Sequence, residues 1–179
     1  LMLAREAWMW TKYDGLKTLN SRLAAFGMTG IPSLFTATNV SDDGTVIVGQ
    51  AAAGLGYGGY IVRLPSLEPY GTGTPGCIGT PVLTGNSLPF LGSPTYAVQS
   101  TNAPSNSTGL WMVGSAADKV GSDPFNIGAP FYINLLASAE FLTFNAMSDA
   151  TGSATCSAPI PSSPFFVGRT YYAQVIWFW

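Results

Sequence analysis

The sequence contains no histidine and very few charged residues. Without histidine, the commonest general base and zinc ligand are missing, and with them the Ser-His-Asp and Cys-His catalytic arrangements. Charged residues make up 9% of the 179 residues, against an average of about 25%. The seven Lys and Arg residues are scattered rather than clustered, which argues against nucleic-acid binding. We therefore expect no cofactor, no metal site and no nucleic-acid partner.

Cysteine is also scarce, and the two cysteines, Cys77 and Cys156, are too few for a metal site alone. In a secreted protein such a pair is typical of one disulfide. The bridge would close a loop of roughly 80 residues and stabilise the fold by about 4 kcal/mol in the chain-entropy model, minus any strain. The chain begins at Leu1 without a signal peptide and has no apolar run of 18 residues, so we expect a processed or truncated form without a membrane span.

What the chain does contain is apolar: 47% of its residues are hydrophobic and 13% are aromatic. It can therefore bury a core easily, while its surface is dominated by uncharged polar residues. A surface so poor in charge resists self-association weakly, which suits an assembling or matrix protein. Ordinary secreted composition explains the same numbers equally well.

Hydrophobic periodicity predicts a mainly-β fold in which residues 1–65 form a β-unit with one short helix. The run at 6–11 predicts a strand with Trp8 and Trp10 on one face. Further strands are predicted at 34–40, 45–49 and 59–64, with an Asp-Gly turn at 41–44 and a Gly/Ala-rich loop at 51–58. The helix is predicted from four apolar residues at helical spacing that end before Gly27: Leu16, Leu19, Leu23 and Phe26.

Residues 5–64 resemble the terminal unit of the HAF-type extracellular repeat of bacterial secreted and autotransporter-like proteins. The resemblance is carried by the ordered motifs Trp10, Asp14-Gly15-Leu16, Leu19-Asn20, Leu23, Gly27, Ala37, Val40-Ser-Asp-Asp-Gly44, Ile47-Val-Gly49 and Tyr60-Ile-Val-Arg-Leu64. It implies a propeller-like antiparallel β-unit of about four strands. Because one repeat cannot bury its own faces, the unit would pack on the following domain, on other chains or on a missing N-terminal portion.

Residues 66–79 are rich in Pro and Gly and predict a linker. Beyond it, residues 80–179 predict a seven-stranded, Ig-like β-sandwich. The predicted strands cover residues 80–85, 94–100, 109–115, 131–137, 141–147, 153–158 and 170–179. The turn at 148–152 predicts a hairpin between the fifth and sixth of them. The last strand is apolar on both faces, so we expect it inside the sandwich or beneath a partner rather than at a sheet edge.

Residues 70–179 resemble the C-terminal β-sandwich of large secreted proteins from planctomycetes and similar environmental bacteria. The motifs are Tyr70-Gly-Thr-Gly-Thr-Pro-Gly-Cys77, Asn102-Ala-Pro104, Gly121-Ser-Asp-Pro-Phe125, Ser148-Asp149, Pro159-Ile-Pro161, Val167-Gly168 and Thr170-Tyr-Tyr-Ala-Gln174. The family carries a cysteine just before the Asn-Ala-Pro motif. This sequence has Gln99-Ser-Thr101 there and Cys156 on a later strand, which puts the family's disulfide pattern in doubt.

The candidate site residues each have a structural alternative. Asp42 and Asp43 could bind calcium, but adjacent turn residues point different ways. Three further aspartates lie on sandwich loops and could form a glycosidase pair, but each also suits a turn: Asp118, Asp123 and Asp149. Tryptophans could stack on sugars or form a contact between subunits, although alternating aromatics are more often core. They are Trp8, Trp10, Trp111, Trp177 and Trp179.

These features favour a non-catalytic structural protein, located outside the cell or at its surface and self-associating or part of a larger surface assembly. An open first strand at 5–11 could pair with a sheet edge of the next subunit. The alternative is a carbohydrate-binding module of a secreted hydrolase, which predicts a row of exposed tryptophans and a polysaccharide partner. A carboxylate enzyme comes third.

Overall fold

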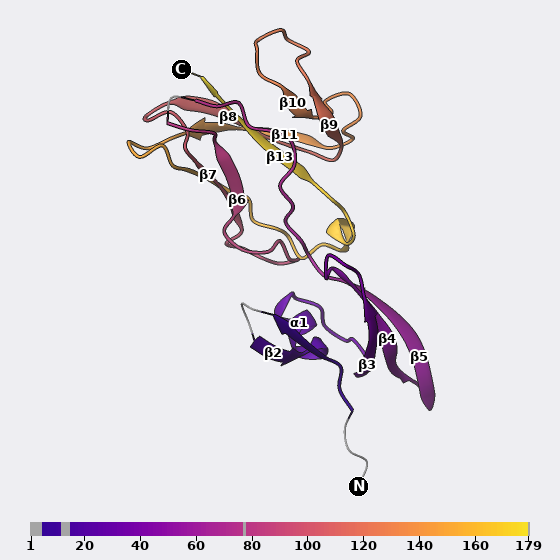
Figure 1. Ribbon diagram of the computed structural model, residues 1–179. Helices are drawn as coiled ribbons and strands as arrows, with labels where there is room; N and C mark the ends of the chain where they lie inside the picture. Colours follow the sequence, from indigo (N-terminus) through magenta and orange to yellow (C-terminus); the bar gives the residue numbers. More distant parts are fainter. Residues whose placement is uncertain (1–4, 12–14, 77, 179) are drawn as a thin grey trace.

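The computed structural model describes residues 5–11, 15–76 and 78–178 of the chain (Figure 1). The fold is mainly β, as the sequence predicts. The first strands and the helix are β1 (Trp8–Thr11), β2 (Gly15–Thr18), α1 (Leu19–Ala25), β3 (Leu34–Val40), β4 (Val46–Ala53) and β5 (Gly56–Arg63). The later elements are β6 (Val82–Gly85), β7 (Ala97–Thr101), β8 (Thr108–Gly114), β9 (Ala117–Ser122), β10 (Phe131–Ile133), β11 (Phe141–Met147), β12 (Ala154–Ser157), η1 (Pro164–Phe166) and β13 (Tyr172–Phe178).

The helix begins later than predicted, because residues 15–18 form strand β2. This strand pairs antiparallel with β1 and places Leu16 opposite Trp10. The helix α1 starts only at Leu19, where the side-chain oxygen of Thr18 caps it by accepting a hydrogen bond from the backbone N–H of Ser21. The apolar spacing that suggested one helix from Leu16 therefore runs across a strand and a helix. Leu16 is exposed rather than part of a buried helical stripe.

The antiparallel sheet β3-β4-β5 is longer than predicted, and the expected loop at 51–58 is wrong. Strands β4 and β5 pair along eight residues each, down to Ala53 opposite Gly56. The connection consists of Gly54, which takes a φ of +56°, and Leu55. Glycine at the first position of a two-residue turn matches the twist of an antiparallel hairpin. The Gly/Ala-rich composition belongs to the strands and not to a loop.

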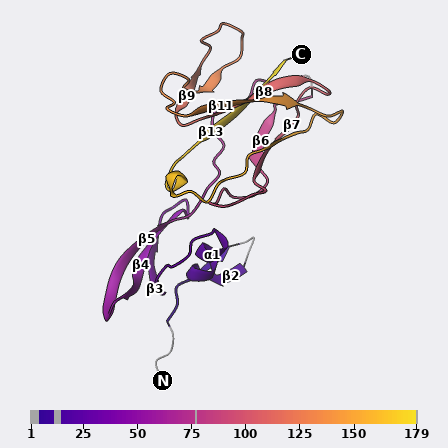
Figure 2. The ribbon, with the colours of Figure 1, turned by 180° about the vertical axis from the view of Figure 1, so that it is seen from behind.

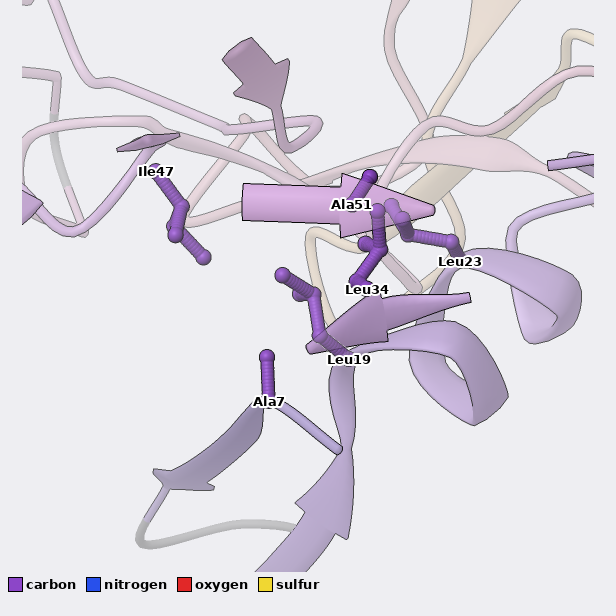
Figure 3. Close-up of a cluster of buried hydrophobic side chains, with 6 residues drawn as sticks. All are labelled: Ala7, Leu19, Leu23, Leu34, Ile47 and Ala51. Atoms are coloured by element: carbon purple, nitrogen blue, oxygen red, sulfur yellow. The ribbon is translucent and has the colours of Figure 1, made fainter. Parts of the chain in front are cut away.

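A first core holds residues 5–64 together. Its six buried side chains come from both the hairpin–helix segment and the sheet, as Figure 3 shows: Ala7, Leu19, Leu23, Leu34, Ile47 and Ala51. The backbone also joins the two parts, since the N–H of Ala7 donates to the carbonyl of Leu34 and the N–H of Leu19 donates to the carbonyl of Ala7. The start of the chain's first strand is therefore already paired within the chain. Strand β1 pairs along one edge with β2, and the pairing of its other edge with another subunit stays a prediction.

Two three-stranded sheets, β12-β7-β6 and β11-β8-β13, face each other across a second core. Its buried residues come from both sheets and from the loop after β7: Ala103, Trp111, Ala146, Ala154 and Trp177. A third core lies on the other face of β8 and β13, where Met112 and Ile176 pack against Phe131 and Ile133 of the β9–β10 hairpin. Strand β9 was not predicted. It adds an eighth described strand to the seven expected beyond residue 79.

The turn at 148–152 does not form the predicted hairpin. Strand β11 pairs with β8, whereas β12 pairs with β7 in the opposite sheet. The chain crosses between the sheets because the buried hydroxyl of Ser148 donates to the carbonyl of Pro104 and accepts from the N–H of Ser107. Asp149 then closes the turn by accepting hydrogen bonds from the backbone N–H groups of Thr151 and Ser153.

Strand β13 is an edge strand, contrary to expectation, because it pairs only with β8 among the described strands. Its faces are nevertheless covered within the chain, with Trp177 in the second core and Ile176 in the third. Its outer edge is partly closed by Tyr70, whose hydroxyl donates to the carbonyl of Ala173. Both views place the segment that joins β5 to β6 alongside the sandwich (Figures 1 and 2). This packing lets a strand with two apolar faces sit at a sheet edge.

Through Tyr70, the segment that follows β5 contacts the sandwich rather than running free of it. The ring of Tyr70 stands edge-on to those of Tyr132 and Tyr172, at centroid distances of 6.4 and 5.4 Å. Burial, with a smaller contribution from Tyr172, raises the pKa of Tyr70 to about 12. A ring pair between Phe26 and Phe90, 6.2 Å apart, joins the end of α1 to the loop before β7. The division into domains at 1–65 and 80–179 stays a prediction.

Candidate interaction surface

Two tryptophans of the β1–β2 hairpin are exposed to solvent on one face of strand β1. Trp8 is 54% exposed and Trp10 is 67% exposed, whereas Met9 between them packs against the first core. Leu16 pairs directly with Trp10 across the hairpin and is 62% exposed. Because directly opposed residues of an antiparallel pair share a face, these three side chains form one exposed apolar patch. We call Trp8, Trp10 and Leu16 the hairpin patch.

A second exposed apolar surface lies on strand β5, on the face of its sheet opposite the first core. Tyr57 is 73% exposed and Ile61 is 71% exposed, while Tyr60 and Val62, of the other parity, pack against the core. The ring of Tyr57 stands edge-on to Phe35 of β3, 5.6 Å away. The alternation of Tyr57 and Ile61 with core-facing residues was the sequence signal for this surface, but the predicted loop at 51–58 concealed it.

The other predicted tryptophans are not part of such a surface. Trp177 is only 6% exposed and is covered within the chain, and Trp111 on β8 is 3% exposed. The indole Nε1 of Trp177 is buried without a hydrogen-bond partner. Trp179 lies outside the described residues. The tryptophan pairs near the two ends of the sequence therefore differ, because Trp8 and Trp10 are bare and Trp177 is part of a sandwich core.

Among the residues that the structure describes, no disulfide is formed. Cys156 is a free thiol on β12, half-buried against the second core, and Cys77 lies outside the described residues. Burial raises the pKa of the Cys156 thiol. A thiol with a raised pKa is protonated near neutrality and reacts slowly. The pairing of the two cysteines stays a prediction.

The predicted carboxylates serve the turns in which they lie. The hydroxyl of Ser41, followed by the N–H and hydroxyl of Thr45, lowers the pKa of Asp43. Asp123 accepts hydrogen bonds from the N–H groups of Ile127 and Gly128 at 3.0 and 2.7 Å. Asp42 is exposed beside Asp43. These hydrogen bonds give Asp43 and Asp123 a structural role in their turns.

The remaining two aspartates behave in the same way. A hydrogen bond from Ser122 is the main cause that lowers the pKa of Asp118, and the hydroxyl of Thr151 is the main cause for Asp149. In the part of the chain that the structure describes, no group of three or more acidic, cysteine or histidine side chains is placed to hold a metal ion. No described helix is long and apolar enough to cross a membrane.

Two shallow hollows accompany the exposed strands. The larger, of about 340 Å³, lies at the end of the β11-β8-β13 sheet, with mostly apolar surroundings: Thr108, Gly109, Asn145, Ala146, Met147 and Phe178. The smaller, of about 200 Å³, lies beside the β3–β4 turn and includes Val40, Val46 and Val48. Neither hollow brings a carboxylate or a thiol to its lining.

A charged cluster on the sandwich also has a structural explanation. Arg169 forms an ion pair with Glu140, and its guanidinium carbon lies 3.6 Å from the centroid of the Phe165 ring. The hydroxyl of Tyr171 donates to the other carboxylate oxygen of Glu140 at 2.9 Å. These contacts tie η1 and the start of β13 to the loop before β11.

Comparison with known proteins adds no relative: no protein-family model, curated protein or solved structure matches this sequence. The resemblances to the HAF-type repeat and to the planctomycete-type sandwich therefore stay predictions. The candidate surface rests on the exposed hairpin patch and on strand β5.

Proposed function

We propose that this protein is a non-catalytic structural protein, located outside the cell or at its surface, that associates with copies of itself or with a larger surface assembly. The observation that carries the proposal is the exposure of large apolar side chains on regular strands within residues 5–63. Trp8, Trp10, Tyr57 and Ile61 are each at least 54% exposed. Contiguous apolar patches on a soluble protein mark interaction sites.

The roles of the carboxylates support the non-catalytic part. A general acid or nucleophile needs a carboxylate that faces a cleft with its oxygens available. Asp43, Asp123 and Asp149 instead accept hydrogen bonds from backbone N–H groups within their own turns. The low charge of the surface and the resemblance to secreted repeat and sandwich domains support the extracellular location.

Sedimentation velocity of the purified chain over a hundredfold range of concentration tests this proposal. A structural protein that assembles through its own surface shows a concentration-dependent increase in mass. A chain that sediments as a monomer at every concentration, and that purifies without a bound partner, would contradict the proposal.

A carbohydrate-binding module is the second candidate, and the hairpin patch favours it. Trp8 and Trp10 are two positions apart on one strand, which spaces their Cα atoms by about 7 Å. Exposed indole rings in a row can stack on the apolar faces of sugars. Pull-down on insoluble polysaccharide would distinguish this candidate. Binding that is lost in Trp8→Ala/Trp10→Ala and kept in Leu55→Ala, an exposed control, would favour it over the structural role.

A further inference from the structure

Strand β5 presents an unprotected sheet edge. It pairs with β4 through eight consecutive residue pairs and with no other described strand. Both views place it at the outer margin of the molecule (Figures 1 and 2). Edge strands that avoid pairing with other chains carry bulges, prolines or charges. Strand β5 contains no bulge and no proline, and its only charge is Arg63 at the end.

The opposite edge of the same sheet is protected. Strand β3 is interrupted by two irregularities in its register with β4, and its first residue, Leu34, already accepts a hydrogen bond from Ala7. Bulges twist an edge and disrupt its ladder. The sheet therefore has one edge that discourages further strands and one that admits them.

The hydrogen-bond pattern fixes which groups of β5 point outward. The N–H of Leu64 donates to the carbonyl of Thr45, just beyond the last pair of the ladder. In an antiparallel pair, alternate residues turn their N–H and C=O groups to the neighbouring strand and the others turn them away. Even-numbered residues of β5 thus face β4. The backbone groups of Tyr57, Gly59 and Ile61 point to the free side.

We propose, on the basis of the structural function inferred above, that β5 pairs antiparallel with β5 of a second copy around a two-fold axis at Gly59. In this register, Tyr57 of each copy lies opposite Ile61 of the other, and Gly59 lies opposite Gly59. The outward backbone groups of these three residues then meet their counterparts. The two three-stranded sheets become one continuous six-stranded sheet.

In this register, the side chains of β5 in one copy are complementary to those of β5 in the other. This self-complementarity identifies the partner as a second copy. On the exposed face, the Tyr57–Ile61 pairs are of the aromatic and β-branched type that stabilises sheets. On the core face, Tyr60 of one copy lies opposite Gly58 of the other, so that a ring meets a residue without a side chain. Arg63 has no like charge opposite it, because it meets Leu55 of the second copy.

Strands β11 and β13 are the other long edges without a bulge among the described strands. The outer edge of β13 is partly closed by the hydroxyl of Tyr70, which leaves β11 as the alternative. Acidic residues flank both of its ends, Glu140 before it and Asp149 just after it. Antiparallel pairing of two β11 strands would bring the Glu140 end of one copy to the Asp149 end of the other, but Arg169 already pairs with Glu140, so these charges do not exclude it. The self-complementary side chains of β5 favour β5, and β11 is the alternative that the test includes.

The test uses paired charges at the two-fold axis. Gly59 is exposed, and a Cβ there would have no neighbour closer than 4.0 Å, so Gly59→Lys and Gly59→Glu leave room for the monomer fold. Either variant alone places like charges opposite each other, and we expect association at least tenfold weaker than in the natural sequence. An equimolar mixture pairs Lys with Glu, and we expect association to return, with the heterodimer resolved by native mass spectrometry. Thr143→Lys on β11 is the control and should associate as the natural sequence does.

The outcomes separate this interface from the proposed function. Association of the natural chain that neither Gly59 variant weakens would overturn the β5 interface and leave self-association in place. Loss of association in Thr143→Lys alone would move the interface to β11. Two monomeric Gly59 variants that stay monomeric when mixed would refute the register, and a natural chain that never associates would contradict both proposals.

Discussion

Two glycines on neighbouring strands, Gly49 of β4 and Gly59 of β5, are expected to respond in opposite ways to the same substitution. The ring of Tyr60 crosses β4 at Gly49 so that its hydroxyl can donate to the carbonyl of Thr36 on β3, at 3.0 Å. A Cβ on Gly49 would overlap the Thr36 carbonyl oxygen and lie 2.8 Å from the Tyr60 ring. No such contact exists at Gly59, where the nearest atom would be 4.0 Å away.

The magnitudes follow from these contacts. Forcing extra volume into a packed site costs about 1–3 kcal/mol, and moving Tyr60 also breaks its hydrogen bond, worth about 1 kcal/mol. We therefore expect Gly49→Ala to lower the free energy of unfolding by about 2–4 kcal/mol. Gly59→Ala should raise it by about 0.5–1 kcal/mol, because alanine loses less backbone entropy than glycine in a strand.

Urea unfolding followed by tryptophan fluorescence and far-UV circular dichroism measures both changes. Tyr60→Phe is a further control, since it keeps the ring and removes only the hydrogen bond. It should cost about 1 kcal/mol, less than Gly49→Ala. The reasoning is refuted if Gly49→Ala and Gly59→Ala change the free energy of unfolding in the same direction by similar amounts.

Three further predictions concern the sandwich. Because the pKa of Tyr70 is about 12 in the folded state and about 10 in an unfolded chain, its contribution to stability is complete below pH 10 and is lost as the pH rises towards 12. Stability measured across this range should fall less in Tyr70→Phe. Ser148→Ala removes the hydroxyl that contacts Pro104 and Ser107, and should lower the free energy of unfolding by about 1–3 kcal/mol in thermal or urea unfolding. A free Cys156 should react with a thiol reagent in the native protein slowly near pH 7 and faster as the pH rises, because burial raises the pKa of its thiol; no reaction until a reductant is added would indicate a disulfide instead.

The sequence predicts best those strands whose own run of apolar and β-branched residues marks where the strand begins and ends. Strands β3 and β11 begin and end where their apolar and β-branched runs do, at Leu34–Val40 and Phe141–Met147. Strand β2 was missed because Leu16 and Leu19 have helical spacing, and only the pairing of Leu16 with Trp10 reveals a strand. Strand β9 was missed because Ala117–Ser122 is polar and shows no alternation.

The pairing of strands was less predictable than their existence. The turn after β11 has the composition of a hairpin, yet the contacts of Ser148 with a segment more than 40 residues away direct the chain to the other sheet. Such contacts have no local signature. The same holds for β13, whose two apolar faces are covered by layers that come from distant parts of the chain.

The candidate surface shows the same limit. Trp8 with Trp10 and Trp177 with Trp179 have identical spacing in the sequence. Trp8 and Trp10 are bare and Trp177 is buried, because a second sheet faces the described part of β13 and no described layer covers that face of β1. Sequence periodicity identifies which side chains share a face. It does not identify what lies against that face.

The position of β8 between β11 and β13 has a consequence for biosynthesis. The central strand of this sheet is translated before both of its neighbours, and β13 begins 58 residues after β8 ends. During synthesis on the ribosome, β8 therefore emerges with both edges unpaired. One edge can pair only after β11 has been translated, and the other only after β13. Partly folded chains with open strand edges are prone to aggregate. Rapid translation of the stretch between β8 and β13, or a chaperone that binds extended apolar segments, should therefore increase the yield of folded protein.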